Sequence, residues 1–153
     1  MKLRVWFFRP DWTDIYSALA GCYLRVRHPN KPLFTHALLT LHDCKHTWVA
    51  EYGAFGFYVE QHDFADISLE RAAIYVEFEV TFNTFLKYLC RLYEIKNHLK
   101  DRRLRLIDFA TNQPTCTYIP SVLFGVQDSG RWLTPVRLAE ELIDLGGEPY
   151  EAP

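Results

Sequence analysis

Apolar and polar residues alternate along several short stretches of this chain. In residues 33–41 and 73–80 every second side chain shares a face, and one face of each stretch is largely apolar. This period of two is typical of a β-strand, whose successive side chains point to opposite faces of a sheet. Residues 3–8, 47–52 and 55–59 are runs rich in β-branched and aromatic residues, so we predict strands there as well.

Other stretches repeat their apolar residues every three or four positions, which is typical of a helix. Residues 11–24 carry four large apolar side chains at this spacing: Trp12, Ile15, Leu19 and Tyr23. Asp11 or Thr13 is the expected N-cap of that helix. Residues 82–99 repeat in the same way, and residues 134–145 begin with Thr-Pro, a cap hydroxyl followed by proline at the first helical position.

The order of these elements predicts an α+β fold in which helices flank an antiparallel central sheet. A turn at residues 43–45 joins two of the strands into a hairpin, and residues 60–70, 112–114 and 127–131 are expected to be loops. The chain has 153 residues, and 49% of them are hydrophobic, which suits a single domain over residues 1–153 with a full core.

Charge and composition argue against several classes of protein. The formal net charge is -2, so no global basic field exists to hold nucleic acid, and we expect no nucleic-acid partner. No run approaches the roughly 20 apolar residues of a membrane span. The first residues hold too short an apolar run for a signal peptide, which predicts a soluble, cytoplasmic protein.

The four cysteines, at positions 22, 44, 90 and 116, lack the close spacing of a disulfide framework or a zinc site. The sequence also has no Gly-rich phosphate loop, no serine nucleophile elbow and no zinc-protease helix. We therefore expect neither a cofactor nor a metal.

Cys116 is the candidate nucleophile. It lies between two threonines, Thr115 and Thr117, and an apolar run that ends at Gly125 follows, which is the pattern of a cysteine at a helix start capped by a threonine hydroxyl. A thiolate at such an end is stabilised by the helix dipole. Pro120 fits in the first turn if the helix begins near Thr117. The alternative is a buried structural cysteine.

His36 is the candidate base for Cys116, because it lies within a semi-buried strand where a polar ring needs a partner. Glu51 comes from the next strand of the hairpin and could orient the His36 ring, as the third member of a triad does. Tyr52 or a backbone carbonyl could do the same, and the register is open. His36 as a satisfied core histidine and Glu51 as a solvated strand residue are the alternatives.

The order His36, Glu51, Cys116 resembles the circularly permuted branch of the NlpC-type, papain-like cysteine hydrolases, which includes the YiiX-like proteins. In that branch the strand with the histidine precedes the helix with the cysteine. The resemblance also rests on five segments: residues 34–39, 48–53, 75–80, 115–125 and 133–138. The last of these resembles a helix that begins with Thr-Pro in small phage-type members.

This resemblance implies a permuted papain-like (NlpC-type) topology and acyl transfer at an amide or thioester bond. Substrates would be peptides or acyl groups, among them the cross-linking peptides of the cell wall. We thus expect a cysteine hydrolase, of amidase or endopeptidase type, with Cys116, His36 and Glu51 as its triad. The alternative is a non-catalytic papain-like-fold protein with protein partners in an assembly, such as a phage particle, which would make it virion-associated.

Overall fold

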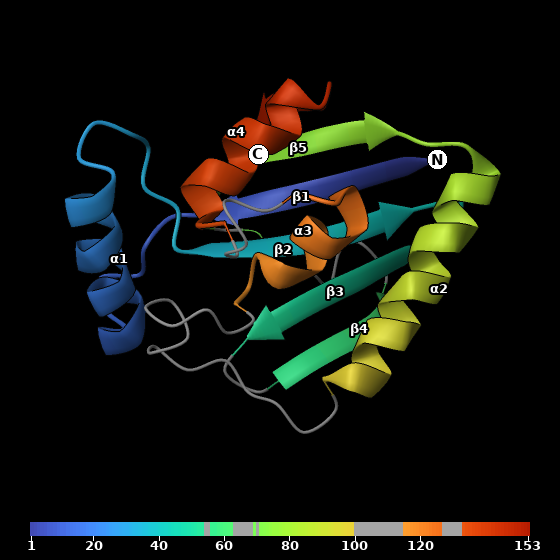
Figure 1. Ribbon diagram of the computed structural model, residues 1–153, viewed down its shortest axis with the longest axis horizontal. Coiled ribbons are helices and arrows are strands. Elements are labelled where there is room, and N and C mark those ends of the chain that lie inside the picture. Colours follow the sequence, from blue (N-terminus) through green and yellow to red (C-terminus); the bar gives the residue numbers. More distant parts are fainter. Residues whose placement is uncertain (54–55, 63–68, 70, 100–114, 127–132) are drawn as a thin grey trace.

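The computed structural model describes residues 1–53, 56–62, 69, 71–99, 115–126 and 133–153 of the chain (Figure 1). Its elements follow the sequence in the order β1 (Lys2–Phe8), α1 (Ile15–Arg27), β2 (His36–His42), β3 (Thr47–Gly53), β4 (Gly56–His62), β5 (Ala72–Glu79), α2 (Phe82–His98), α3 (Tyr118–Phe124), α4 (Pro135–Asp144) and β6 (Glu148–Glu151).

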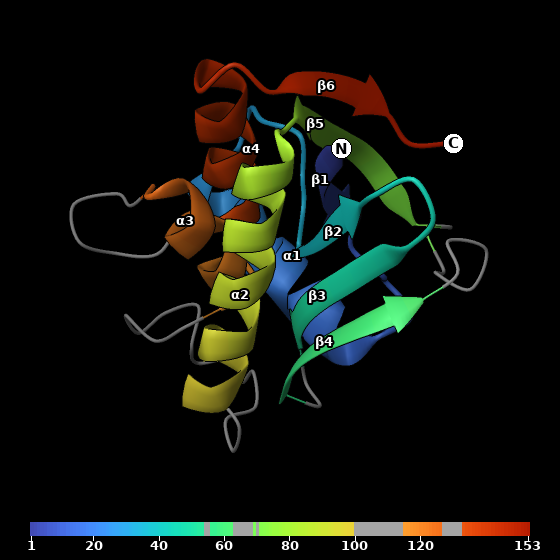
Figure 2. The same cartoon turned by 90° about the vertical axis from the view of Figure 1, so that its right-hand side faces the viewer.

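The strands form one six-stranded sheet in the order β4-β3-β2-β1-β5-β6, and every neighbouring pair is antiparallel. The expected α+β class with an antiparallel central sheet is therefore confirmed. Helices α2, α3 and α4 lie together on one side of this sheet (Figure 2). Strand β6 was not expected, and β4 extends to His62, beyond the expected end at residue 59.

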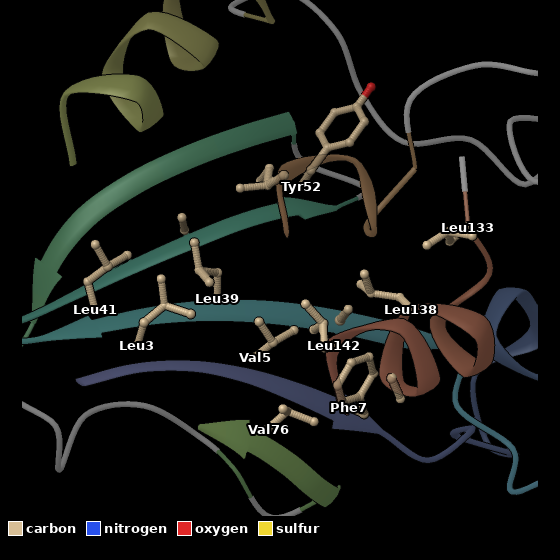
Figure 3. Packing of buried hydrophobic residues seen from close by; sticks show 14 of the residues in the cluster. Leu3, Val5, Phe7, Leu39, Leu41, Tyr52, Val76, Leu133, Leu138 and Leu142 are labelled. Atoms are coloured by element: carbon tan, nitrogen blue, oxygen red, sulfur yellow. The ribbon is translucent and has the colours of Figure 1, made fainter. Parts of the chain in front are cut away.

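The main core lies between the sheet and these helices. Leu3, Val5 and Phe7 alternate along β1 and are fully buried on its helix-facing side. Leu138 and Leu142 of α4 are also fully buried and belong to the same cluster (Figure 3). The alternate residues of β1 and the residues four apart on α4 thus form one apolar layer between sheet and helices. Burial of such a layer is the dominant favourable contribution to folding.

Helix α1 does not bury the face that its sequence spacing suggested. Trp12, Ile15 and Leu19 are 60%, 68% and 49% exposed, and the residues buried against the rest of the protein are Ala20, Gly21 and Leu24. The predicted helix exists, but a period of 3.6 defines an apolar face without saying which neighbour covers it. The small residues on the inward side allow close packing, since a Cβ added at Gly21 would lie 3.1 Å from the Trp12 ring.

The start of α1 also differs from the expectation. Asp14 is the N-cap, and its carboxylate accepts from the backbone N–H of Ser17. Asp11 instead accepts from the backbone N–H and the hydroxyl of Thr13 in the preceding turn. Neither Asp11 nor Thr13 is therefore the cap.

The expected loops at residues 112–114 and 127–131, and most of that at 60–70, lie outside the described residues. Within the described part of the chain, no helix has the length and apolar character needed to cross a membrane.

Candidate active site

The candidate nucleophile lies immediately before helix α3. Thr117 is the N-cap position, so Cys116 is one residue outside the helix. Pro120 is the third helical residue, where the missing N–H loses no intrahelical bond because the first turn has no acceptors for it. Gly125 ends the helix with a φ of +69°, as expected for a left-handed C-cap.

The two threonines beside Cys116 do not cap the helix with their side chains, which corrects the sequence-based expectation. The Thr117 hydroxyl donates instead to the carbonyl of Leu133 at 2.5 Å, and the Thr115 and Thr117 hydroxyls lie 2.8 Å apart. Both side chains are buried, and the Thr117 hydroxyl donates to a distant carbonyl while accepting no bond from a backbone N–H of the first turn. These bonds hold the cysteine segment against the chain that enters α4.

The structure brings Cys116 to the start of β2, where His36 is the first residue. The Cys116 thiol donates to the carbonyl oxygen of Thr35 at 3.9 Å, and its side chain lies close enough to the His36 ring to raise the pKa of that ring. The Cys116 side chain is only 1% exposed.

Glu51 reaches His36 across the hairpin of β2 and β3. The pairing of Leu39 with Ala50, continued by one residue, places Glu51 opposite Leu38, and so diagonal to His36. Diagonal side chains on one face of a sheet are within reach of each other when they are long. The Nε2 of His36 and the Oε1 of Glu51 are 2.7 Å apart, and both side chains are about one quarter exposed.

Tyr58 is a fourth member of this network that sequence reasoning missed. It lies directly opposite Glu51 in the pairing of β3 with β4, and its hydroxyl donates to the second carboxylate oxygen, Oε2. His36, Glu51 and Tyr58 therefore form one chain of hydrogen bonds across three neighbouring strands. The tyrosine could have been found from sequence only with the register of β4, which the break at Gly53 and Gly56 obscures.

The electrostatics of the site favour a charged His36 ring. Burial alone would lower the pKa of His36, because it disfavours the charged form, but the hydrogen bonds to Cys116 and Glu51 and the charges of these two groups raise it to about 10. An imidazole with this pKa is protonated at neutral pH.

The pKa values of Glu51 and Tyr58 shift in the directions that keep Glu51 ionised and Tyr58 protonated. Burial would raise the pKa of Glu51, but its hydrogen bond and charge interaction with His36, together with the bond from Tyr58, hold it below its ordinary value. Burial and the bond to Glu51 raise the pKa of Tyr58, so its hydroxyl remains a donor at neutral pH. Glu51 is thus an ionised acceptor with two donors.

Among the residues that the structure describes, no group of three or more His, Cys, Asp or Glu side chains is arranged so that it could hold a metal ion. The arrangement of Cys116, His36 and Glu51 can supply a nucleophilic sulfur, a proton on a ring nitrogen and a carboxylate that fixes the ring. Comparison of the chain with family models, with curated proteins and with solved structures finds no match in any of the three.

Proposed function

We propose that this protein is a cysteine hydrolase in which Cys116 is the nucleophile, His36 the base and acid, and Glu51 the group that orients His36. The observation that carries the proposal is that the His36 ring is hydrogen-bonded to Glu51 at 2.7 Å and lies beside the Cys116 side chain, which raises its pKa. A nucleophile, its base and an orienting third group in series are the requirements for acyl transfer by a cysteine. The resemblance to the permuted NlpC-type hydrolases, with the papain-like topology that it implies, agrees with this assignment.

In the proposed reaction His36 has already taken the proton of Cys116. The thiolate attacks the carbonyl carbon of an amide or ester, and a C–S bond forms as the carbonyl oxygen gains the electron pair. Backbone N–H groups near the start of α3 are the proposed donors to this oxyanion. The C–N or C–O bond then breaks, and the leaving group takes the proton from His36.

Water releases the acyl group in the second half of the reaction. Neutral His36 takes a proton from water, the hydroxide attacks the thioester carbonyl, and the C–S bond breaks to return the thiolate. Glu51 and Tyr58 keep the ring in one orientation throughout, because Glu51 accepts from both side chains. Peptides, including cell-wall peptides, and acyl groups are the proposed substrates.

The test is a search for the acyl-enzyme. The protein is incubated with p-nitrophenyl acetate, and the added acetyl mass is located by peptide mapping. We expect one acetyl group on Cys116, none in Cys116→Ala, and slower acetylation in His36→Gln. Equal acetylation at the exposed Cys22, Cys44 and Cys90, with none at Cys116, would contradict the proposal.

A second candidate function is a non-catalytic role in a protein assembly. Two observations favour it: the Cys116 side chain is 1% exposed, and helix α1 presents large apolar side chains to solvent. Under this interpretation Cys116 is a packing residue, and the acetylation experiment gives no label at Cys116.

A further inference from the structure

Helix α1 carries an exposed apolar stripe on one side. We define the α1 stripe by five residues, all of which are large, apolar and more than one third exposed: Ile15, Tyr16, Leu19, Tyr23 and Val26. Ile15, Leu19 and Val26 lie along one line of the helix, and Tyr16 and Tyr23 lie along the neighbouring line. Val26 reaches 84% exposure, and Ile15 and Tyr16 each reach 68%.

The opposite side of α1 is already packed, so the stripe is a second apolar surface of the same helix. Ala20, Gly21 and Leu24 are buried against the protein. The helix lies at one end of the molecule, beside the sheet (Figure 1). Contiguous exposed apolar patches on a soluble protein usually mark an interaction surface.

The charges at the two ends of α1 indicate what the partner is. The exposed Asp14 lies at the N-terminal end, and Arg25 and Arg27 lie in the last turn, while no acidic residue occurs in the helix itself. Such a helix is complementary to its own copy turned by 180°, because each acidic end then meets a basic end and the two helix dipoles oppose each other.

We propose that α1 of one molecule pairs antiparallel with α1 of a second copy through the α1 stripe. Placing Asp14 opposite Arg27 fixes the alignment, and Ile15 then faces Val26 while Leu19 faces Cys22. Cys22 is exposed, and this alignment places it near the two-fold axis. Helix axes in such a contact are about 8–10 Å apart, so the two Cys22 thiols come within the span of a short cross-linker. The pairing is independent of the proposed catalysis.

One helix pair covers less surface than the roughly 1,600 Å² of a standard interface, so a dissociation constant of about micromolar order is expected. The mass of the full chain is measured by light scattering over a range of concentrations. The wild type should pass from monomer to dimer as concentration rises. Leu19→Lys should weaken the dimer by at least about tenfold, because it places a charge in the apolar contact.

Leu86→Lys is the matched control, because Leu86 is an exposed leucine of α2, 41% exposed against 49% for Leu19. This variant should dimerise as the wild type does. Arg27→Glu should also weaken the dimer, since it places like charges next to Asp14 of the second copy. A wild type that stays monomeric, or a dimer that Leu19→Lys leaves intact, would overturn the proposal.

A cross-linking experiment locates the contact. A short bismaleimide should join two chains through Cys22, and the product should vanish in Cys22→Ser and persist in Cys44→Ser and Cys90→Ser, whose wild-type thiols are also exposed. Cross-links through Cys44 or Cys90 alone would place the interface elsewhere. A monomer that floats with phosphatidylglycerol vesicles, and loses this in Leu19→Lys, would assign the stripe to a lipid surface and overturn the dimer.

Discussion

His36 and His42 stand at the two ends of strand β2 and, six residues apart, point to the same face of the sheet. Both side chains are half-buried. His36 meets a carboxylate and a thiol, and its pKa rises to about 10. His42 meets the hydroxyls of Thr40 and Thr47, and burial, together with the nearby charge of Arg4, lowers its pKa to about 4.

The contrast shows that burial on a strand does not by itself make a histidine chemically useful. Burial pushes the pKa of both rings downward, and only the pKa of His36, whose ring has both Cys116 and Glu51 beside it, rises above the ordinary value. At neutral pH His42 is a neutral member of a hydroxyl network. His36 is a cation that can hold and return a proton. Substitutions at His36 and at its hydrogen-bond partners should therefore slow the reaction, whereas substitutions at His42 should not.

The largest effect is expected from exchanging each histidine for glutamine. His36→Gln should slow acetylation of Cys116 by roughly 10²–10⁴-fold, the usual contribution of a positioned acid or base. His42→Gln should leave the rate within about twofold, since His42 hydrogen-bonds with Thr40 and Thr47. The rates are measured with the same ester by mass spectrometry. Equal losses in both variants would mean that general destabilisation, rather than the loss of a base, explains the effect.

Removing only the carboxylate should have a smaller effect. Glu51→Gln keeps a hydrogen-bonding side chain but removes the charge that favours the protonated ring. We expect a loss of about tenfold to a hundredfold, below that of losing the base itself. The pKa of His36, followed by NMR, should fall as well. A rate as low as that of Cys116→Ala would give Glu51 a more central role than orientation.

The two histidines should give stability opposite dependences on pH. His36 has a folded pKa of about 10 and an ordinary value of 6.5, so its contribution is full below pH 6.5 and lost as pH rises toward 10. His42 has a folded pKa of about 4, so its contribution is full above pH 6.5 and lost as pH falls toward 4. Both terms favour a stability maximum near pH 6.5.

Thermal unfolding across this pH range tests the assignment. In a plot of Tm against pH, His36→Gln should flatten the alkaline side and His42→Gln the acid side. Each change in Tm should be a few °C, since 1 kcal/mol shifts the Tm of a chain of this size by about 2–4 °C. If His36→Gln instead changes only the acid side, His36 is the neutral ring of the two at neutral pH, and the contrast between the histidines fails.

The smallest effect is expected at Tyr58. Tyr58→Phe removes one hydrogen bond to a charged acceptor, which is worth roughly 1.5–3 kcal/mol of stability, and leaves the bond between His36 and Glu51 in place. Acetylation of Cys116 should slow by less than about tenfold. Denaturant unfolding and the ester assay measure the two quantities. A rate loss as large as that of Glu51→Gln would contradict this order and make Tyr58 as important for the reaction as the carboxylate itself.

The sequence predicted those features that depend on local periodicity. Alternation identified β2 and β5, and the hairpin turn made a contact between His36 and Glu51 plausible before the register was known. It could not identify Tyr58, because that contact requires the pairing of β3 with β4. The sequence did not predict strand β6 either, because all four of its residues are exposed and show no alternating pattern.

Two other features required knowledge of distant neighbours. The Thr117 hydroxyl donates to the carbonyl of Leu133, sixteen residues away, and only the tertiary structure shows that this carbonyl is within reach. Helix α1 was predicted from its spacing, but the buried side proved to be that of Ala20 and Gly21 rather than that of Ile15 and Leu19. Both faces of α1 are apolar enough to be buried.

The central claim is that Cys116 is an activated nucleophile, and thiol labelling tests it most directly. The protein is treated with iodoacetamide at mildly acidic pH, where an ordinary thiol with a pKa of about 8.5 reacts slowly, and labelled sites are mapped by mass spectrometry. Cys22, Cys44 and Cys90 are exposed and serve as internal references, whereas Cys116 is buried. We predict that Cys116 is labelled first and that His36→Gln slows it. Labelling of the three exposed cysteines with Cys116 unmodified would contradict the claim.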